Sequence, residues 1–383
     1  MGSRAVLVLA DGTFFEGTGF GASEKEVEGE VVFSTSMTGY TELLTDPSFS
    51  QQILTLTCPE IGNCGVTLSD RESDRIHAAA LVVRELSPVV SNWRAEISLD
   101  DWLKHEGVPG LCGVDTRALV HHLRANGSMM AILSTCQEAD IVALHARAKK
   151  LEGMEGRDLV SEVTTQGSYV FQNGLTNLDG SDVMSHTNEP FHVVVVDFGV
   201  KRNMLRLLVH HGCRVTVVPA NVSATDVLDR LPDGVLLSNG PGDPATMTGP
   251  IHLVQNLIGK IPIFGICMGH QILSLAAGAK TYKLKFGHRG ANQPVMGQDR
   301  KVQITSQNHG FAVDDQDQIE GLIQTQINVS DATVEGVELL DQWAFGVQYH
   351  PEGAPGPHDA QGYFARFIDL MRMWKKTQAG GVF

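Results

Sequence analysis

The sequence has few aromatic residues and no excess of basic ones. Phe, Trp and Tyr together make up 6% of the chain, and the formal net charge is −15 at pH 7. A surface that binds nucleic acid needs clustered Lys and Arg, often with aromatic rings among them. We therefore expect no nucleic-acid partner.

Long apolar segments are also missing. No run approaches the roughly 18 apolar residues that are needed to cross a bilayer. The first apolar stretch, residues 5–9, ends before Asp11 and is too short for a secretory signal. These absences predict a cytoplasmic protein that does not bind membranes.

Several chemical motifs are absent as well. The six cysteines, at positions 58, 64, 112, 136, 213 and 267, form no C-x-x-C pair of the kind found in zinc and redox sites. Neither a G-x-x-x-x-G-K-[ST] loop nor a G-x-G-x-x-G turn between a strand and a helix is present. We expect no metal and no cofactor in this chain, with five buried thiols and a reactive Cys267.

Length and composition predict two globular domains. The chain has 383 residues, of which 42% are hydrophobic and 19% charged, an ordinary globular balance. Residues 1–150 contain short apolar clusters broken by turns, which indicates a mixed α+β domain with helices at 100–105 and 116–125. Residues 151–190 are polar and rich in Gly, Ser, Thr and Asn, which predicts a connector.

Residues 191–383 alternate between strand and helix patterns. Strands are expected at residues 192–196, 214–218, 234–237 and 261–266, and helices at residues 202–211, 224–230, 251–258 and 268–277. This order predicts an α/β domain with a doubly wound, mostly parallel sheet. In such sheets the chemistry lies at the carboxyl ends of the strands.

Cys267 has the sequence context of a nucleophile. It directly follows one predicted strand and directly precedes a predicted helix, with Gly265 and Gly269 two residues away on either side. This is the pattern of a nucleophile elbow with cysteine in place of serine. The helix N-terminus favours the thiolate, and the Met268 amide can donate to an oxyanion. A buried structural thiol is the alternative, which the two glycines make the weaker one.

A second strand end carries a glycine- and proline-rich turn at residues 238–244. Its glycines allow backbone amides to approach a ligand, so Gly240 is a candidate second oxyanion donor. The same residues would also serve as a plain turn. In a parallel sheet, however, this turn and the Cys267 elbow share one edge, and each therefore supports the other.

The base that would activate Cys267 is less well defined by the residues alone. His350 follows an apolar run, and Glu352 is close enough to orient its imidazole in a Cys-His-Glu triad. His270, one helical turn from Cys267, and His309 compete for the role. The spacing alone leaves these alternatives open.

Taken together, these motifs resemble those of class I, triad-type glutamine amidotransferases. The resemblance rests on residues 238–244, 264–271 and 350–352. Five blocks of the first domain further resemble the small, glutamine-hydrolysing subunit of carbamoyl-phosphate synthase. These blocks are residues 29–33, 37–40, 44–48, 61–63 and 113–117. The similarity extends from about residue 7 to residue 375, nearly the whole chain.

The resemblance implies a role for each residue in a matching block. Cys267 would be the nucleophile, His350 the base and Glu352 its partner, with Gly240 and Met268 forming the oxyanion hole. The implied glutamine contacts are Ser48, Gly240, Gly242, Gln271, Asn308, Gly310 and Phe311. Because Ser48 comes from the first domain, the pocket is expected to need both domains, and neither should be active alone.

The family's activity is the hydrolysis of glutamine to glutamate through a γ-glutamyl thioester. The ammonia would pass to a large subunit that uses bicarbonate, ATP and a divalent metal to make carbamoyl phosphate for arginine and pyrimidine synthesis. The chain's two ends, with no presequence and no fused synthetase, indicate a separate bacterial-type subunit in a heterodimer. The rival interpretations are the glutaminase of an anthranilate or guanylate synthase, a non-catalytic regulatory subunit and a stand-alone cysteine hydrolase.

Overall fold

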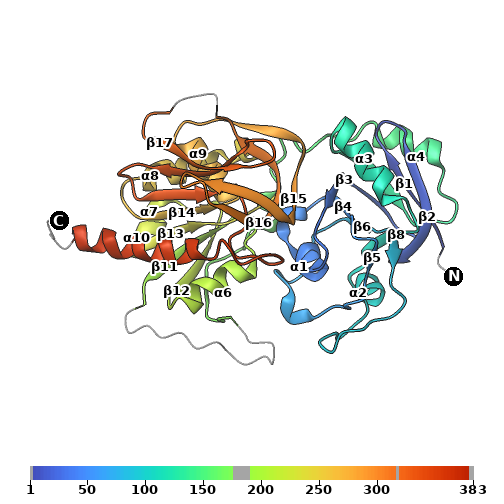
Figure 1. Cartoon of the computed structure of the whole chain (residues 1–383), viewed down its shortest axis with the longest axis horizontal. Coiled ribbons are helices and arrows are strands. Elements are labelled where there is room, and N and C mark those ends of the chain that lie inside the picture. Colours follow the sequence, from blue (N-terminus) through green and yellow to red (C-terminus); the bar gives the residue numbers. More distant parts are fainter. Residues whose placement is uncertain (1–2, 176–189, 316–318, 379–383) are drawn as a thin grey trace. The chain divides into compact units, whose positions relative to one another are not determined.

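The computed structural model describes residues 3–175, 190–315 and 319–378 (Figure 1). The chain folds as two compact units. The first consists of Met1–Glu155 with Lys285–Gly290, and the second of Gly156–Leu284 with Ala291–Phe383. No helix of the described residues is both long enough and apolar enough to span a membrane.

The first unit is built on a closed barrel with strand order β1-β2-β8-β6-β4-β3-β9. Its strands are β1 (Arg4–Leu9), β2 (Phe14–Gly21), β3 (Glu26–Ser34), β4 (Gln52–Leu56), β6 (Ala80–Val82), β8 (Pro109–Cys112) and β9 (Met129–Ser134), with the short pair β5 (Glu60–Ile61) and β7 (Glu85–Leu86) outside it. The mixed α+β class is confirmed. Closure of the barrel, by pairing of β1 with both β2 and β9, was not predicted.

The helices of this unit form where the sequence supplies caps. They are α1 (Tyr40–Thr45), α2 (Leu99–Glu106), α3 (Thr116–Asn126) and α4 (Ile141–Ala148), with the 3₁₀ turns η1 (Pro47–Phe49) and η2 (Leu68–Asp70). The side chains of Ser98 and Asp115 accept hydrogen bonds from backbone amides in the first turns of α2 and α3. Both helices lie where the sequence predicts them, within two residues at each end.

The second unit contains a ten-stranded sheet with the order β10-β12-β11-β13-β14-β19-β18-β17-β15-β16. The strands are β10 (Tyr169–Phe171), β11 (His192–Asp197), β12 (Arg214–Pro219), β13 (Gly234–Leu237), β14 (Ile263–Ile266), β15 (Thr281–Gly297), β16 (Val302–Val313), β17 (Leu322–Asn328), β18 (Val334–Leu339) and β19 (Ala344–Val347). Strands β12, β11, β13 and β14 are parallel neighbours, as predicted, and β19 continues the parallel pairing beside β14, which was not predicted. The antiparallel extension through β18 and β17 was not predicted.

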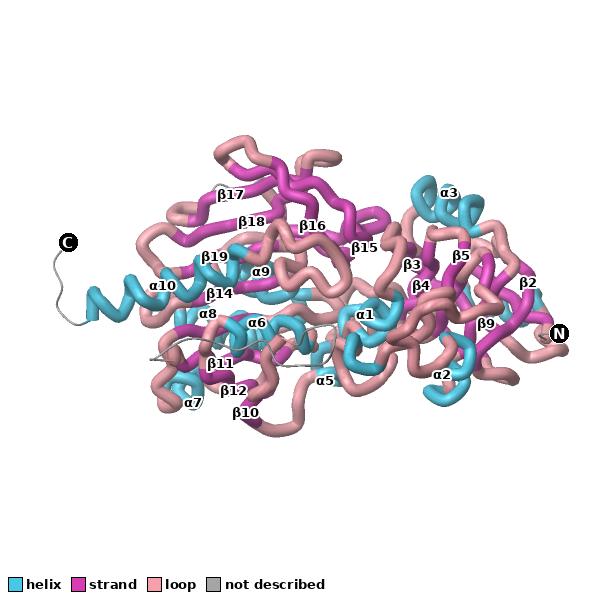
Figure 2. Tube along the Cα trace, turned by 60° about the horizontal axis from the view of Figure 1, so that its bottom comes forward, coloured by secondary structure: helices cyan, strands magenta, loops and turns pink. Residues whose placement is uncertain are grey.

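Helices cover both faces of the parallel part of this sheet. They are α5 (Val160–Val163), α6 (Arg202–His210), α7 (Ala224–Leu228), α8 (Thr248–Leu257), α9 (Met268–Ala276) and α10 (Gly362–Gln378), with the 3₁₀ turn η3 (Pro244–Thr246). Alternate valines of β11 point to opposite faces. Val193 and Val195 pack with α6 and α10, whereas Val194 and Val196 pack with α7, α8 and α9. Figure 2 shows these helices beside the strands of the sheet. The doubly wound arrangement is therefore confirmed.

The segment predicted as a connector carries structure of its own. Within residues 156–175, α5 is followed by β10, which pairs antiparallel with β12 at the edge of the second sheet. Asp243 N also donates to Arg157 O at 3.0 Å, so the segment contacts the turn after β13. Residues 176–189 of the predicted connector lie outside the described residues.

The prediction that five cysteines are buried is wrong. Cys213 is buried, but the side chains of four others are only half-buried: Cys58, Cys64, Cys112 and Cys136. All four lie in the first unit, at strand ends or in loops. Cysteine content alone did not reveal this, because the burial of a residue depends on its place in the fold.

Candidate active site

Cys267 lies between the end of β14 and the start of α9. Its φ of 53° and ψ of −104° are an uncommon combination for a residue with a side chain, and its backbone N–H donates to Val347 O at 2.9 Å. Buried strand residues hold one side of this turn and the first turn of α9 holds the other. Cys267 is 2% exposed, so almost none of it is accessible to solvent.

The two glycines of the elbow are required by close backbone approaches. A Cβ on Gly265 would lie 2.5 Å from Gly269 O, and a Cβ on Gly269 would lie 2.1 Å from Leu237 O. Both distances are far below van der Waals contact. The strand therefore turns into the helix this sharply only because both positions lack a side chain.

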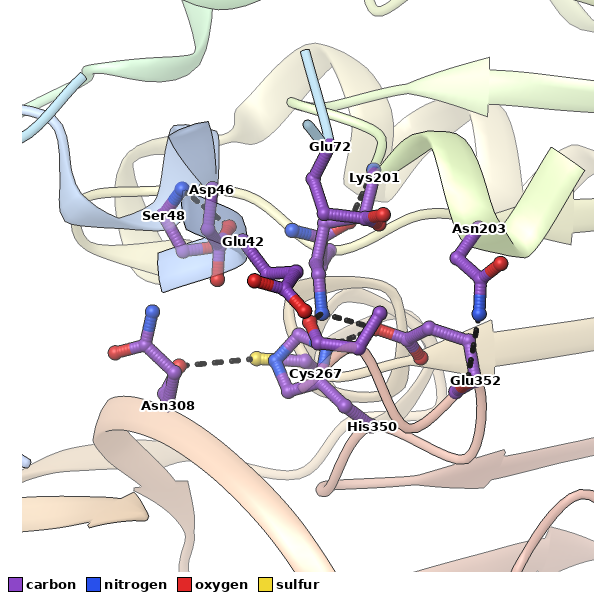
Figure 3. Close-up of polar contacts among 12 residues, drawn as sticks. Glu42, Asp46, Ser48, Glu72, Lys201, Asn203, Cys267, Asn308, His350 and Glu352 are labelled. Atoms are coloured by element: carbon purple, nitrogen blue, oxygen red, sulfur yellow. Dashed lines mark hydrogen bonds and ion pairs between the residues drawn. The ribbon is translucent and has the colours of Figure 1, made fainter. Parts of the chain in front are cut away.

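His350 and Glu352 follow β19, which is the parallel neighbour of β14. His350 N donates to Ser306 O at 2.8 Å, which fixes the backbone beyond the strand end. His350 Nδ1 lies 2.7 Å from Glu352 Oε1, with both side chains buried (Figure 3). Nε2 has no hydrogen-bond partner among the described residues, which leaves it for the Cys267 thiol, and Cys267 is among the groups that raise the pKa of His350.

Lys201, at the N-cap of α6, completes this buried polar group. Its ammonium Nζ lies 2.8 Å from Glu352 Oε1 and also donates to Ala354 O, while Asn203 Nδ2 donates to Glu352 O at 2.8 Å (Figure 3). The sequence reasoning missed both residues. The available signal was their position just beyond β11, at the same sheet edge as Cys267.

The charges in this group determine its protonation states. Burial alone would raise the pKa of Glu352, but the Lys201 ammonium and His350 hold it well below its usual range. For His350, burial and the Lys201 charge lower the pKa, but the Glu352 charge together with the interactions of the ring with Cys267 and Glu352 raises it on balance. The site therefore favours an ionised Glu352 beside a protonated His350.

The turn after β13 lies beside the elbow, as the parallel pairing of β13 and β14 requires. Gly269 N donates to Ser238 O at 2.9 Å, which joins the turn to the first turn of α9. A Cβ on Gly240 would lie 2.3 Å from Phe198 O, so this position also needs glycine. Met268 is the first residue of α9, and its amide is among the helix N-terminal donors without an intrahelical acceptor.

The two competing histidines have other surroundings. Burial lowers the pKa of His270 to about 3, so its ring is neutral at physiological pH. His309 Nδ1 donates to Phe311 O at 2.8 Å, and its Nε2 lies 3.2 Å from Gln307 Oε1. Among the three candidates, His350 is the one whose ring bonds to Glu352 and whose pKa is raised in part by Cys267.

Of the predicted glutamine contacts in the second unit, Asn308 contacts Cys267, and Gln271 and Phe311 are bonded to each other. Asn308 O lies 3.7 Å from Cys267 Sγ, and Gln271 Nε2 donates to Phe311 O at 2.7 Å. Gly310 lies between Asn308 and Phe311 on β16. Gly242 has a φ of +89° in the turn after β13.

The remaining predicted contact, Ser48, belongs to the first unit. It is buried within η1, where its backbone N–H donates to Asp46 Oδ1 at 2.9 Å. Asp46 is the N-cap of this turn and fixes the local conformation of residues 47–49.

Comparison with known families agrees with this geometry. Residues 194–370 match the family described as "Glutamine amidotransferase class-I", which defines the class of the second unit and its cysteine site. Residues 7–133 match the "Carbamoyl-phosphate synthase small chain, CPSase domain". The chain is therefore a glutamine-hydrolysing amidotransferase that also carries the CPSase domain of the small chain.

Curated relatives match along almost the whole chain. The carbamoyl phosphate synthase small chain of Syntrophotalea carbinolica is 51% identical over 98% of this chain and 100% of its own length. The corresponding proteins of Vibrio vulnificus and Salmonella typhimurium are 50% and 47% identical, each over 97% of this chain and at least 98% of their own. The chain belongs to the carbamoyl phosphate synthase small chain family.

Proposed function

We propose that Cys267 is the nucleophile that attacks the side-chain amide of glutamine, with His350 as its base. The observation that carries the proposal is the state of the His350 ring, whose Nδ1 lies 2.7 Å from Glu352 Oε1 while its buried Nε2 has no partner in the described part of the chain and its pKa is raised in part by Cys267. Glu352 holds Nδ1 and favours the imidazolium. The raised pKa of His350 suits a base that takes the proton of the Cys267 thiol and keeps it until ammonia departs.

The reaction follows from this pair. The thiolate attacks the amide carbon of glutamine, and the resulting oxyanion accepts hydrogen bonds from the Gly240 and Met268 amides. Each donor is worth about 3 kcal/mol in comparable sites. His350 gives its proton to the departing ammonia, which leaves a γ-glutamyl thioester on Cys267. Water activated by the neutral imidazole then releases glutamate.

Substrate recognition is proposed for the residues of the matching blocks. In the second unit these residues are Gly240, Gly242, Gln271, Asn308, Gly310 and Phe311, and in the first unit Ser48. Gln271 uses its Nε2 for hydrogen bonds within the protein, which makes its Oε1 the atom for a donor of the substrate.

The ammonia released at Cys267 serves a second protein. We propose that it passes to a large subunit in a cytoplasmic heterodimer, where bicarbonate and ATP with a divalent metal yield carbamoyl phosphate for arginine and pyrimidine synthesis. The names of the curated relatives support this partner. The match of residues 7–133 favours it over an anthranilate or guanylate synthase.

Replacement of the nucleophile tests the proposal. Cys267→Ser in the complex with the large subunit should abolish glutamine-dependent synthesis of carbamoyl phosphate and leave ammonia-dependent synthesis intact. The second activity is the internal control, because it reports that the complex has assembled. Undiminished use of glutamine by this variant would remove Cys267 from the mechanism.

A further inference from the structure

Gln348 contacts the sulfur of Cys267 from the strand that leads to the base. It directly follows β19, is completely buried, and its backbone N–H donates to Glu335 O at 2.9 Å. Both Gln348 and His350 interact with Cys267, the first by a hydrogen bond and the second through its raised pKa. Gln348 Nε2 donates to Cys267 Sγ at a distance of 3.7 Å.

The orientation of the Gln348 amide is fixed by a chain of hydrogen bonds. Phe311 O can only accept, so Gln271 must present its NH₂ group to it, at 2.7 Å. The same Gln271 nitrogen lies 2.9 Å from Gln348 Oε1. A nitrogen donor requires an oxygen on the other side, which turns the Gln348 NH₂ group toward the sulfur. The alternative orientation would bring two NH₂ groups together.

The need for such a donor follows from the other neighbours of the sulfur. Asn308 O, 3.7 Å away, is an acceptor, which favours the neutral thiol and disfavours a thiolate. The side chain of Cys267 is 2% exposed, so water contributes little to solvating an anion there. An N–H donor aimed at the sulfur offsets both effects, because a hydrogen bond to an ionised group is stronger than one to a neutral group.

We propose that Gln348 is a further catalytic residue, whose side-chain amide donates a hydrogen bond to the Cys267 thiolate. The proposal rests on the nucleophilic role of Cys267. With the proton of the thiol held on His350 Nε2, the electron pair of the former S–H bond stays on sulfur, where the Gln348 N–H stabilises it. The same bond stabilises the thiolate when it leaves the thioester during release of glutamate.

Two substitutions separate the donor from the shape of the side chain. Gln348→Met keeps a similar length without a donor. Gln348→Glu keeps the oxygen that accepts from Gln271 and replaces the donor by a second oxygen. Gln326→Met is the matched control, because Gln326 is a buried glutamine of the same unit that accepts from Tyr349 OH at 2.8 Å. It has no role in the proposed chemistry.

The measurement is the pH dependence of Cys267 labelling in the assembled complex. The probe is a glutamine analogue in which a chloromethyl ketone replaces the side-chain amide, and the labelled peptide is followed by mass spectrometry. Gln348→Met should move the midpoint of labelling upward by about one pH unit, a tenfold loss of rate near pH 7. Gln348→Glu should move it further, and Gln326→Met should leave it unchanged.

Unchanged midpoints in Gln348→Met and Gln348→Glu would overturn the proposal, provided that ammonia-dependent synthesis and the melting temperature show folded complexes. An equal shift in Gln326→Met would also overturn it, since the effect would then come from loss of a buried amide in general. These outcomes differ from those expected if Cys267 is not the nucleophile. In that case Cys267→Ser would still hydrolyse glutamine and the wild-type label would be found on another residue.

Discussion

Lys201 Nζ lies 2.8 Å from Glu352 Oε1, and both side chains are buried, 3% and 0% exposed. The same carboxylate oxygen meets His350 Nδ1 at 2.7 Å. One buried anion is thus shared by a lysine that is charged at neutral pH and a histidine whose charge depends on that anion. This sharing makes Lys201 part of the electrostatics of the site, although it does not contact Cys267 directly in the described contacts.

Replacing Lys201 should therefore affect both stability and catalysis. Lys201→Met leaves the Glu352 carboxylate buried without its ammonium partner, which we expect to cost about 3 kcal/mol of unfolding free energy. The pKa of Glu352 should rise toward its usual range. Urea unfolding and the pH profile of glutamine hydrolysis measure the two effects. An unchanged unfolding midpoint would show that the ion pair has no net stabilising role.

Removing the charge of Glu352 should weaken the base. Glu352→Gln keeps an oxygen that can accept from His350 Nδ1, but the interaction that raises the pKa of His350 is lost. The imidazolium and thiolate pair then becomes less populated, and the rate of hydrolysis should fall about tenfold to a hundredfold. The measurement is kcat for glutamine hydrolysis at several pH values. A kcat and pH profile equal to those of the wild type would contradict this role of the carboxylate.

Alanine at an elbow glycine should lower the stability of the protein, although helix propensity alone favours alanine. Alanine favours helices over glycine, but a Cβ at Gly269 would lie 2.1 Å from Leu237 O, so Gly269→Ala should destabilise the protein by about 3 kcal/mol. Gly362→Ala, at the start of α10 where no atom lies within 4 Å of an added Cβ, is the control. It should be neutral or stabilising by up to about 1 kcal/mol. Equal effects of both changes in thermal unfolding would exclude the close approach as the cause.

Because His270 is buried in its neutral form, we expect the unfolding free energy of the protein to fall in mild acid. Burial lowers its pKa to about 3 from an ordinary value of 6.5, so the unfolded chain binds more protons below pH 6.5. This histidine should account for about 2 kcal/mol of lost unfolding free energy between pH 7 and pH 5. The effect is present at high pH and lost as the pH falls. In urea unfolding at the two pH values, His270→Met should show a smaller difference than the wild type, and an equal difference would refute the prediction.

The sequence predicts the parts of the site that depend on local pattern. A buried strand, a cysteine between two glycines and a helix are adjacent in the chain, so the elbow at Cys267 could be inferred directly. Lys201 could not, because it meets Glu352 across 151 positions of sequence and its charge is matched only in the folded state. Gln348 lies two residues before His350, and only the hydrogen bonds from Gln271 show that its NH₂ group faces the sulfur.

In the fold as well, the sequence predicts features that depend on local patterns and not those that depend on distant residues. The alternation of strands and helices after residue 190 predicts the parallel strands and their covering helices, because each element is marked by its own apolar pattern. Closure of the first barrel depends on the pairing of β1 with β9, which are far apart in the chain. No local pattern of residues specifies such a pairing.

Detection of a thioester on Cys267 during turnover would show that this cysteine is the nucleophile. The complex is mixed with glutamine, quenched in acid during turnover and digested, and the peptide that contains Cys267 is weighed by mass spectrometry. If Cys267 is the nucleophile, we expect a γ-glutamyl group on that cysteine in the wild type and none in Cys267→Ser. Steady turnover of glutamine with the adduct absent, or found on another residue, would contradict it.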